Sequence, residues 1–353
     1  MPDLDNCCGE ISITGFRLPN TESSVQNEWD VQGGMIISRH RAIGKKPKSG
    51  DSHLGGDCHL IKSTSVEFKC QGVVLRGELF FPDGIGPWPG AVLLHGFASD
   101  HHEMVRAARE LAARGVAALA FDLRGHGQSG GVYAEDPIGD VLAAAALLAH
   151  QPNVDAGRIA LVGHSISGRV VLLAAARDPS IAAVVALAPA ADNGGAKLLA
   201  GLDHLPPSPD GTVYHYPGDS PFPGMRPRRN AQAIADMRRM GYRLAVDWVR
   251  LAHSWVQQPV ADVISAVAPT PVLLVHCLWD DKVPLWHTLS LYRRARPPRA
   301  LILSPWGVHS SPCRSALVRR MWIGWLGRAL RVPVRRPVLQ PARVYVRRKG
   351  QGR

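Results

Sequence analysis

No run of apolar residues in this chain is long enough to cross a membrane. The longest uncharged apolar stretches lie near residues 141–149 and 181–191, well short of the ~20 residues that a membrane-spanning helix needs. The N-terminus also lacks a basic segment followed by an apolar block, so no secretory signal is readable there. These two absences lead us to expect a cytoplasmic protein.

The cysteines lack the spacing of a paired motif. None of the six forms a C-x-x-C pair; they are Cys7, Cys8, Cys58, Cys70, Cys277 and Cys313. A disulfide framework is typical of small secreted chains in oxidising compartments. The pattern therefore predicts free thiols in a reducing compartment.

Acidic residues are missing from the C-terminal part of the chain. From Lys282 onward there are 17 Lys or Arg and no Asp or Glu, whereas the whole chain carries a formal charge of +12. We interpret residues 333–353 as a solvated basic tail, and the alternative is a weak contact with an anionic membrane. No nucleic-acid-binding motif accompanies the basic residues, so we expect no nucleic-acid partner.

Apolar periodicity is scarce in residues 1–62, which are rich in Gly, Ser, Asn, Asp and Lys. We predict that this segment is disordered. After it, short apolar strand patterns alternate with helical ones. We expect strands at 66–70, 73–81, 91–94, 116–121, 158–162, 181–188, 271–275 and 300–303, and helices at 103–114, 138–150, 168–177, 285–294 and 315–330. Such alternation predicts an α/β fold, in which helices cover both faces of a mostly parallel sheet.

The alternation is interrupted over about 190–265. Seven prolines fall between residues 206 and 227, too many for regular structure, and two helices are expected after them, at 230–240 and 242–256. An insertion between two strands of one sheet is well placed to cap the crevice at their carboxyl ends, where ligands bind in open α/β sheets. We therefore predict one domain over 63–332 with a helical cap insertion.

The most informative motif is a serine between a strand pattern and a helix pattern. Residues 160–168 read Ala-Leu-Val-Gly-His-Ser-Ile-Ser-Gly, with Ser165 at the turn. This is the strand–turn–helix context of a nucleophile elbow, where the serine hydroxyl projects above the sheet edge. Its neighbours must be small because strand and helix meet there with little room. The G-x-S-x-G pattern is met with one departure, because Ser167 occupies the second glycine position and glycine follows at Gly168.

Partners for such a serine follow later in the chain. A serine hydroxyl becomes a good nucleophile when a base takes its proton and a third group orients that base. Asp280 and Asp281 come just after the strand pattern at 271–275, where an acid is well placed to orient a histidine. His309 lies in the loop after the strand pattern at 300–303, from which it can reach over the serine.

Other chemistry-bearing residues near these motifs have structural interpretations. Three histidines lie too close along the chain to their acidic or serine neighbours to act over them: His95, His126 and His164. The run His101-His102-Glu103 has no second ligand cluster at metal-binding spacing and is interpreted as the first turn of a helix. The run after Arg124, Gly-His-Gly, lacks the Lys-Ser/Thr of a phosphate loop and the pattern of a dinucleotide site. We expect no metal ion and no cofactor.

Together these motifs resemble serine hydrolases of the α/β-hydrolase fold. The nearest resemblance is to bacterial esterases of the dienelactone-hydrolase-like and serine-aminopeptidase-like groups, over about residues 66–330. Besides the serine motif it rests on Leu94-His95-Gly96-Phe97, on Phe121-Asp122-Leu123-Arg124-Gly125-His126-Gly127-Gln128-Ser129, and on Trp279-Asp280-Asp281-Lys282-Val283-Pro284. These segments are specific for the fold and poor guides to the substrate.

The resemblance implies a role for each member of the set. Ser165 is the nucleophile and His309 the general base, in the family order of serine, acid and histidine. The family places its acid three residues before Val-Pro, which selects Asp280, with Asp281 as the fallback.

The resemblance also implies two donors for the oxyanion, the backbone N–H groups of Phe97 and Ile166. Cys277 stands where the family usually has glycine and is, with Ser167, one of two departures. Both replacements are small, so we expect them to tune the site rather than abolish it.

The implied activity is hydrolysis of a small-molecule carboxylic ester through an acyl-enzyme. An acyltransferase, a thioesterase or a peptidase would use the same residues, and a non-catalytic binding protein of this fold is the alternative from another class. Hydrolases with an aspartate nucleophile are disfavoured because the turn carries Ser165.

Overall fold

The computed structural model describes residues 61–191 and 242–331. The predicted disordered segment 1–62, except its last two residues, lies outside the described residues. So do the predicted basic tail at 333–353, the helix predicted at 230–240 and the proline-rich part of the insertion. Among the described helices, none combines the length and apolar character needed to cross a membrane.

A single large sheet of eight strands forms the centre, in the spatial order β1-β2-β4-β3-β6-β7-β9-β10. β1 and β2 form an antiparallel hairpin and β2 pairs antiparallel with β4, whereas all other neighbours in this sheet are parallel. The strands are β1 (Ser63–Cys70), β2 (Val73–Phe80), β3 (Trp88–Leu94), β4 (Ala117–Phe121), β6 (Val154–His164), β7 (Ala183–Leu187), β9 (Val272–Cys277) and β10 (Arg299–Ser304), with β5 (His126–Gly127) and β8 (Arg243–Leu244) pairing separately. The predicted mostly parallel sheet is confirmed.

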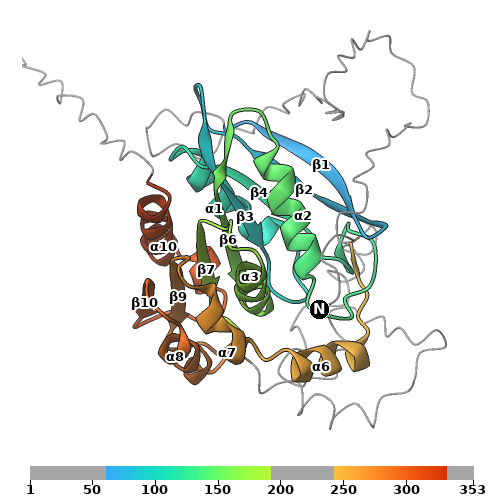
Figure 1. Cartoon of the computed structure of the whole chain (residues 1–353), viewed down its shortest axis with the longest axis vertical. Coiled ribbons are helices and arrows are strands. Elements are labelled where there is room, and N and C mark those ends of the chain that lie inside the picture. Colours follow the sequence, from blue (N-terminus) through green and yellow to red (C-terminus); the bar gives the residue numbers. More distant parts are fainter. Residues whose placement is uncertain (1–60, 192–241, 332–353) are drawn as a thin grey trace, which may run out of the picture.

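Helices cover both faces of this sheet (Figure 1). They are α1 (His102–Ala112), α2 (Ile138–Ala149), α3 (Ile166–Arg177), α6 (Trp248–Gln257), α7 (Val260–Val263), α8 (Leu285–Arg294), α9 (Ser311–Arg314) and α10 (Ala316–Ala329), with the 3₁₀ helix η3 (Ile264–Val267). Because strand side chains alternate between faces, Val92 joins the core under α2 and α3, and Leu93 joins the core under α1 and α10. The predicted α/β-hydrolase architecture is therefore present.

The helix predicted over 242–256 is wrong in its first part. Arg243 and Leu244 form β8 and pair with β5 instead, and α6 begins only after Asp247, whose carboxylate accepts the N–H of Arg250. Pairing between residues more than a hundred positions apart overrides the local helical pattern here.

A buried ion pair ties α3 to the loop before α2. The Nε of Arg169 donates to Oδ2 of Asp136 at 2.8 Å, and each side chain is only 2% exposed. The same guanidinium donates to the carbonyl of Gln258, just after α6. Removing one partner of a buried pair leaves the other charge uncompensated in a medium of low dielectric constant.

We therefore expect Asp136→Ala to lower the free energy of unfolding by about 3 kcal/mol. Glu67→Ala is the control, because Glu67 and Arg76 form an ion pair whose side chains are 39% and 37% exposed; it should change the free energy by less than about 1 kcal/mol. Denaturant unfolding of both variants measures the difference. Equal and small effects would contradict the importance of the buried pair.

Candidate active site

Ser165 stands at the turn between β6 and α3, within residues 163–168, which we call the serine turn. Its φ is 58°, in the left-handed region that residues other than glycine rarely adopt. Its N–H donates to the carbonyl of Leu187 at 2.8 Å. Its carbonyl accepts from the N–H groups of Gly168 at 3.0 Å and Ala190 at 3.1 Å. The surrounding backbone thus holds the serine in a strained conformation, a feature that clusters at functional sites.

The small residues of the serine turn are required by close packing. A Cβ on Gly163 would overlap the carbonyl oxygen of Ser167, and one on Gly168 would lie 3.0 Å from Pro189. Ser167 itself is fully buried, and its hydroxyl donates to the carbonyl of His95 at 2.5 Å. This departure from the glycine pattern keeps the turn and ties it to the loop after β3.

Asp280 and His309 meet beyond the carboxyl ends of β9 and β10. Nδ1 of His309 lies 2.8 Å from Oδ2 of Asp280. The other carboxylate oxygen accepts the N–H groups of Lys282 at 2.9 Å and Val283 at 2.8 Å. Burial raises the pKa of Asp280, but the hydrogen bonds and charge of His309 and these N–H groups lower it by more, so the pKa is below its usual value. Asp280 is therefore ionised at neutral pH and held in place by its hydrogen bonds.

Asp281 occupies a different environment. Its side chain is 55% exposed and lies 3.8 Å from the Lys282 ammonium. Its carboxylate oxygen accepts the backbone N–H of His309 at 3.3 Å and has no contact with the imidazole among the described residues. Of the two candidate acids, the structure brings Asp280 to the ring.

His309 lies beside the serine turn. Its ring centroid is 4.7 Å from that of His164, the residue before Ser165. Nε2 of His164 donates to the backbone carbonyl of His309 at 2.9 Å. Within the described part of the chain no hydrogen bond joins the Ser165 hydroxyl to His309. In unliganded enzymes this contact is often long and tightens when substrate binds.

The two predicted oxyanion donors flank the serine. Ile166 is the first residue of α3, so its N–H has no partner within the helix. Phe97 ends the His-Gly loop, residues 95–97, in which a Cβ on Gly96 would lie 3.4 Å from the Cβ of Ser165. Neither N–H donates to an acceptor elsewhere in the described ranges. Their role as oxyanion donors stays a prediction.

His95 and His126 form hydrogen bonds that hold the His-Gly loop and the loop after β4. Nδ1 of His95 donates to the carbonyl of Gly96 at 2.7 Å, and its Nε2 accepts the N–H of Leu123 at 3.1 Å. Nδ1 of His126 donates to the carbonyl of Arg124 at 3.1 Å. Burial, with the nearby His95, lowers the pKa of His126 to about 3, so its ring is neutral at neutral pH.

Within residues 61–191 and 242–331, two groups of side chains have donor atoms close enough to hold a metal ion. They are Asp100, His101 and His102, and the largely buried set of Glu103, His164 and Cys313; within each group the donor atoms lie within 4.8 Å of one another. In both groups the donors already contact one another, at 3.0 Å between Nδ1 of His102 and Asp100 and at 2.9 Å between Nδ1 of His164 and Glu103. The second group has no signal in the sequence, because its members come from three separate elements.

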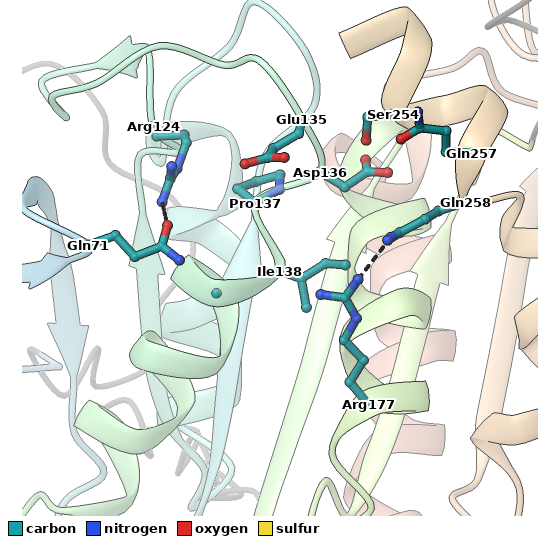
Figure 2. A pocket seen from close by; sticks show the side chains of 11 residues that line it. Gln71, Arg124, Glu135, Asp136, Pro137, Ile138, Arg177, Ser254, Gln257 and Gln258 are labelled. Carbon is teal, nitrogen blue, oxygen red and sulfur yellow. Dashed lines mark hydrogen bonds between the residues drawn. The ribbon is translucent and has the colours of Figure 1, made fainter. Parts of the chain in front are cut away.

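A polar cavity lies where the loop before α2 faces the end of α6 (Figure 2). It is lined by Gln71, Arg124, Glu135, Asp136, Pro137, Ile138, Gly139, Arg177, Ser254, Gln257 and Gln258. Arg124 is held by Asp140 at 2.6 Å, and Arg177 donates to Gln258 at 2.9 Å. Since these charged groups are satisfied by protein partners and none of the predicted site residues lines the cavity, we assign it no role.

Comparison with known proteins agrees with this architecture. The chain is an enzyme of the α/β-hydrolase type. Residues 71–310, more than half of its length, match the family model described as X-Pro dipeptidyl-peptidase (S15 family), and the chain belongs to that family. The resemblance to serine hydrolases of this fold, drawn from the motifs, is confirmed.

Individual relatives match at moderate identity. The thiohydrolase apmlB of Arthrinium phaeospermum is 38% identical over 138 residues, which cover 36% of this chain and 43% of the relative. The polyketide transferase grgF of Penicillium sp is 26% identical over 262 residues, covering 67% of this chain and 86% of the relative. The crystal structure of α/β hydrolase GrgF from Penicillium sp. sh18 has a TM-score of 0.61 at 23% identity, covering 77% of this chain and 100% of that chain. The chain thus spans less than half the length of the first relative.

The geometry of the two acids predicts unequal effects of neutralising them. Asp280→Asn should lower kcat for hydrolysis of p-nitrophenyl acetate by about 10⁴-fold, because the imidazole loses its orienting carboxylate. Asp281→Asn should have a much smaller effect, because Asp281 contacts the backbone N–H of His309 and not its imidazole. A larger loss in Asp281→Asn than in Asp280→Asn would show that Asp281 is the partner of the histidine.

Proposed function

We propose that this chain is a serine hydrolase that cleaves a small-molecule carboxylic ester through an acyl-enzyme. Ser165 is the nucleophile, His309 the general base and Asp280 the carboxylate that orients it. The observation that carries the proposal is the 2.8 Å contact between His309 and Asp280 beside the strained serine turn. Because a carboxylate only accepts hydrogen bonds, Nδ1 of His309 keeps its proton and Nε2 is left to take the proton of the serine hydroxyl.

The reaction then proceeds in two halves. Oγ of Ser165 bonds to the carbonyl carbon while its proton passes to Nε2 of His309. The N–H groups of Phe97 and Ile166 receive the resulting oxyanion, each stabilising the transition state by about 3 kcal/mol. The bond to the leaving alcohol breaks as His309 returns the proton to that oxygen. Water then attacks the acyl-enzyme, with His309 taking a proton from it, and the acid departs as Ser165 regains its hydroxyl proton.

Two further candidate reactions are the hydrolysis of a thioester and the transfer of the acyl group to an acceptor other than water. The names of two relatives support them, since one is a thiohydrolase and the other a polyketide transferase. The same three residues serve both reactions. The outcome depends on whether sulfur or oxygen leaves, and on whether the acyl-enzyme meets water, an alcohol or an amine.

An X-Pro peptide, the substrate in the family's description, ranks lower on electrostatic grounds. Its free amino terminus carries a charge that needs an anionic partner once it is buried. Among the described residues beside the serine turn, Glu103 is paired with His164 and Asp280 with His309. Asp281, which accepts the backbone N–H of His309, is mostly exposed. An ester without a positive charge fits these surroundings better.

Covalent labelling tests the nucleophile. A fluorophosphonate probe should label the wild type, and Ser165→Ala should abolish labelling because Oγ is the reacting atom. Ser167→Ala is the matched control from the same turn and should still be labelled. Labelling that persists in Ser165→Ala would place the nucleophile elsewhere, and a folded wild type that is not labelled would favour a non-catalytic binding protein.

A substrate panel tests the bond that is cleaved. We expect kcat/KM to be highest for p-nitrophenyl esters of varied chain length, lower for the matched acyl thioesters and lowest for an Ala-Pro p-nitroanilide. The anilide ranks last because Glu103 and Asp280, the described acids paired beside the serine turn, are not free to bind its charged amino terminus. A higher kcat/KM for the anilide than for every ester would contradict the proposed substrate class.

A further inference from the structure

A buried ion pair joins the serine turn to α1. It joins Glu103, in the first turn of α1, to His164, the last residue of β6. Oε1 of Glu103 is 2.9 Å from Nδ1 of His164, and the two side chains are 12% and 4% exposed. A buried pair loses much of its hydration on folding, and neither residue takes part in the acyl transfer described above.

The second carboxylate oxygen of Glu103 and the second ring nitrogen of His164 each form a hydrogen bond with a loop of the site. Oε2 of Glu103 accepts the N–H of Gly96 at 2.8 Å, one residue before the Phe97 donor. Nε2 of His164 donates to the backbone carbonyl of His309 at 2.9 Å. One bridge of two side chains therefore connects the His-Gly loop, the serine turn and the loop that carries His309.

The protonation of the bridge follows from its partners. The His309 carbonyl accepts a hydrogen bond from Nε2 of His164, so that nitrogen carries a proton. The Glu103 carboxylate lies 2.9 Å from Nδ1 and favours a second proton there by its charge. Burial lowers the pKa of His164 and the Glu103 carboxylate raises it; the pKa lies well above its usual value. Burial raises the pKa of the Cys313 thiol, so that thiol is neutral at neutral pH. Glu103, whose pKa is lowered by His164 and Gly96 against the effect of burial, supplies the countercharge.

We propose that Glu103 and His164 are positioning residues that hold the Phe97 N–H and the His309 ring in register with Ser165. The inference rests on the proposed function and adds to it two residues that do not touch the substrate. Misplacing a reacting group by about 1 Å costs on the order of 100-fold in rate. The bridge prevents such displacement because it anchors both loops to the end of the same strand.

Two substitutions at Glu103 distinguish the effect of its hydrogen bonds on the loops from the effect of its negative charge. Glu103→Ala removes the acceptor of the Gly96 N–H and the partner of His164, so kcat should fall by about 100-fold while KM changes by less than about threefold. Glu103→Gln keeps the bridge, because its amide oxygen accepts from Gly96 and its amide N–H donates to neutral His164. The Nε2–H of His164 still donates to His309, so kcat should stay within about fivefold of the wild type.

Glu110→Ala is the matched control. Glu110 lies on the same helix and pairs with buried Arg319 at 2.9 Å, away from both loops. This variant should lose thermal stability but keep kcat. The proposal is overturned if Glu103→Ala keeps its kcat, if Glu110→Ala loses as much kcat as Glu103→Ala, or if Glu103→Gln is as impaired as Glu103→Ala.

Hydrogen exchange gives a readout that does not depend on the chemistry. Peptides that contain Gly96 and His309 should exchange faster in Glu103→Ala than in the wild type or Glu103→Gln. Unchanged exchange at both loops would overturn the bridge even in an enzyme whose serine reacts. A wild type that resists the fluorophosphonate, with loops that loosen in Glu103→Ala, would instead overturn the proposed function and support the bridge.

Discussion

Ser165 keeps a left-handed backbone because neighbouring residues satisfy both of its backbone polar groups. The acceptor is the carbonyl of Leu187 at the end of β7, and the donors are Gly168 and Ala190. This arrangement requires parallel strands whose carboxyl ends meet at one edge, which is also where α/β sheets bind ligands. The helix that follows is anchored by the buried Arg169–Asp136 pair. The order of the strands and the packing of α3 therefore both determine the backbone conformation of Ser165.

Two carboxylate–histidine pairs flank this turn, and their surroundings give them different capabilities. In the Asp280–His309 pair only Nδ1 contacts a carboxylate, and the imidazole is 15% exposed. In the Glu103–His164 pair both ring nitrogens face acceptors, and the imidazole is 4% exposed. We therefore propose that the first ring exchanges a proton with a ligand and that the second holds the two loops in position. Residue type alone does not distinguish the two histidines. They differ in Nε2, which in His164 donates to a backbone carbonyl.

Local signals made much of this structure predictable. The alternation of strand and helix patterns indicated the sheet, and Ser165, Asp280 and His309 each follow a recognisable strand, so their approach to one edge was foreseeable. The pairing of β8 with β5 was not, because it joins residues distant in sequence. The bridge through Glu103 is not predictable for the same reason: the neighbours of His164 along the chain indicate a structural role, but they do not reveal its partner from α1.

Trapping the acyl-enzyme tests the central claim most directly. The wild type is mixed with p-nitrophenyl acetate, quenched in acid within one turnover and digested, and the site of acetylation is mapped by mass spectrometry. The account predicts an acetyl group on Ser165 that forms before acetate is released, and its loss in His309→Ala, where the base is absent. An acetyl group on any other residue, or full turnover without an adduct on Ser165, would contradict it.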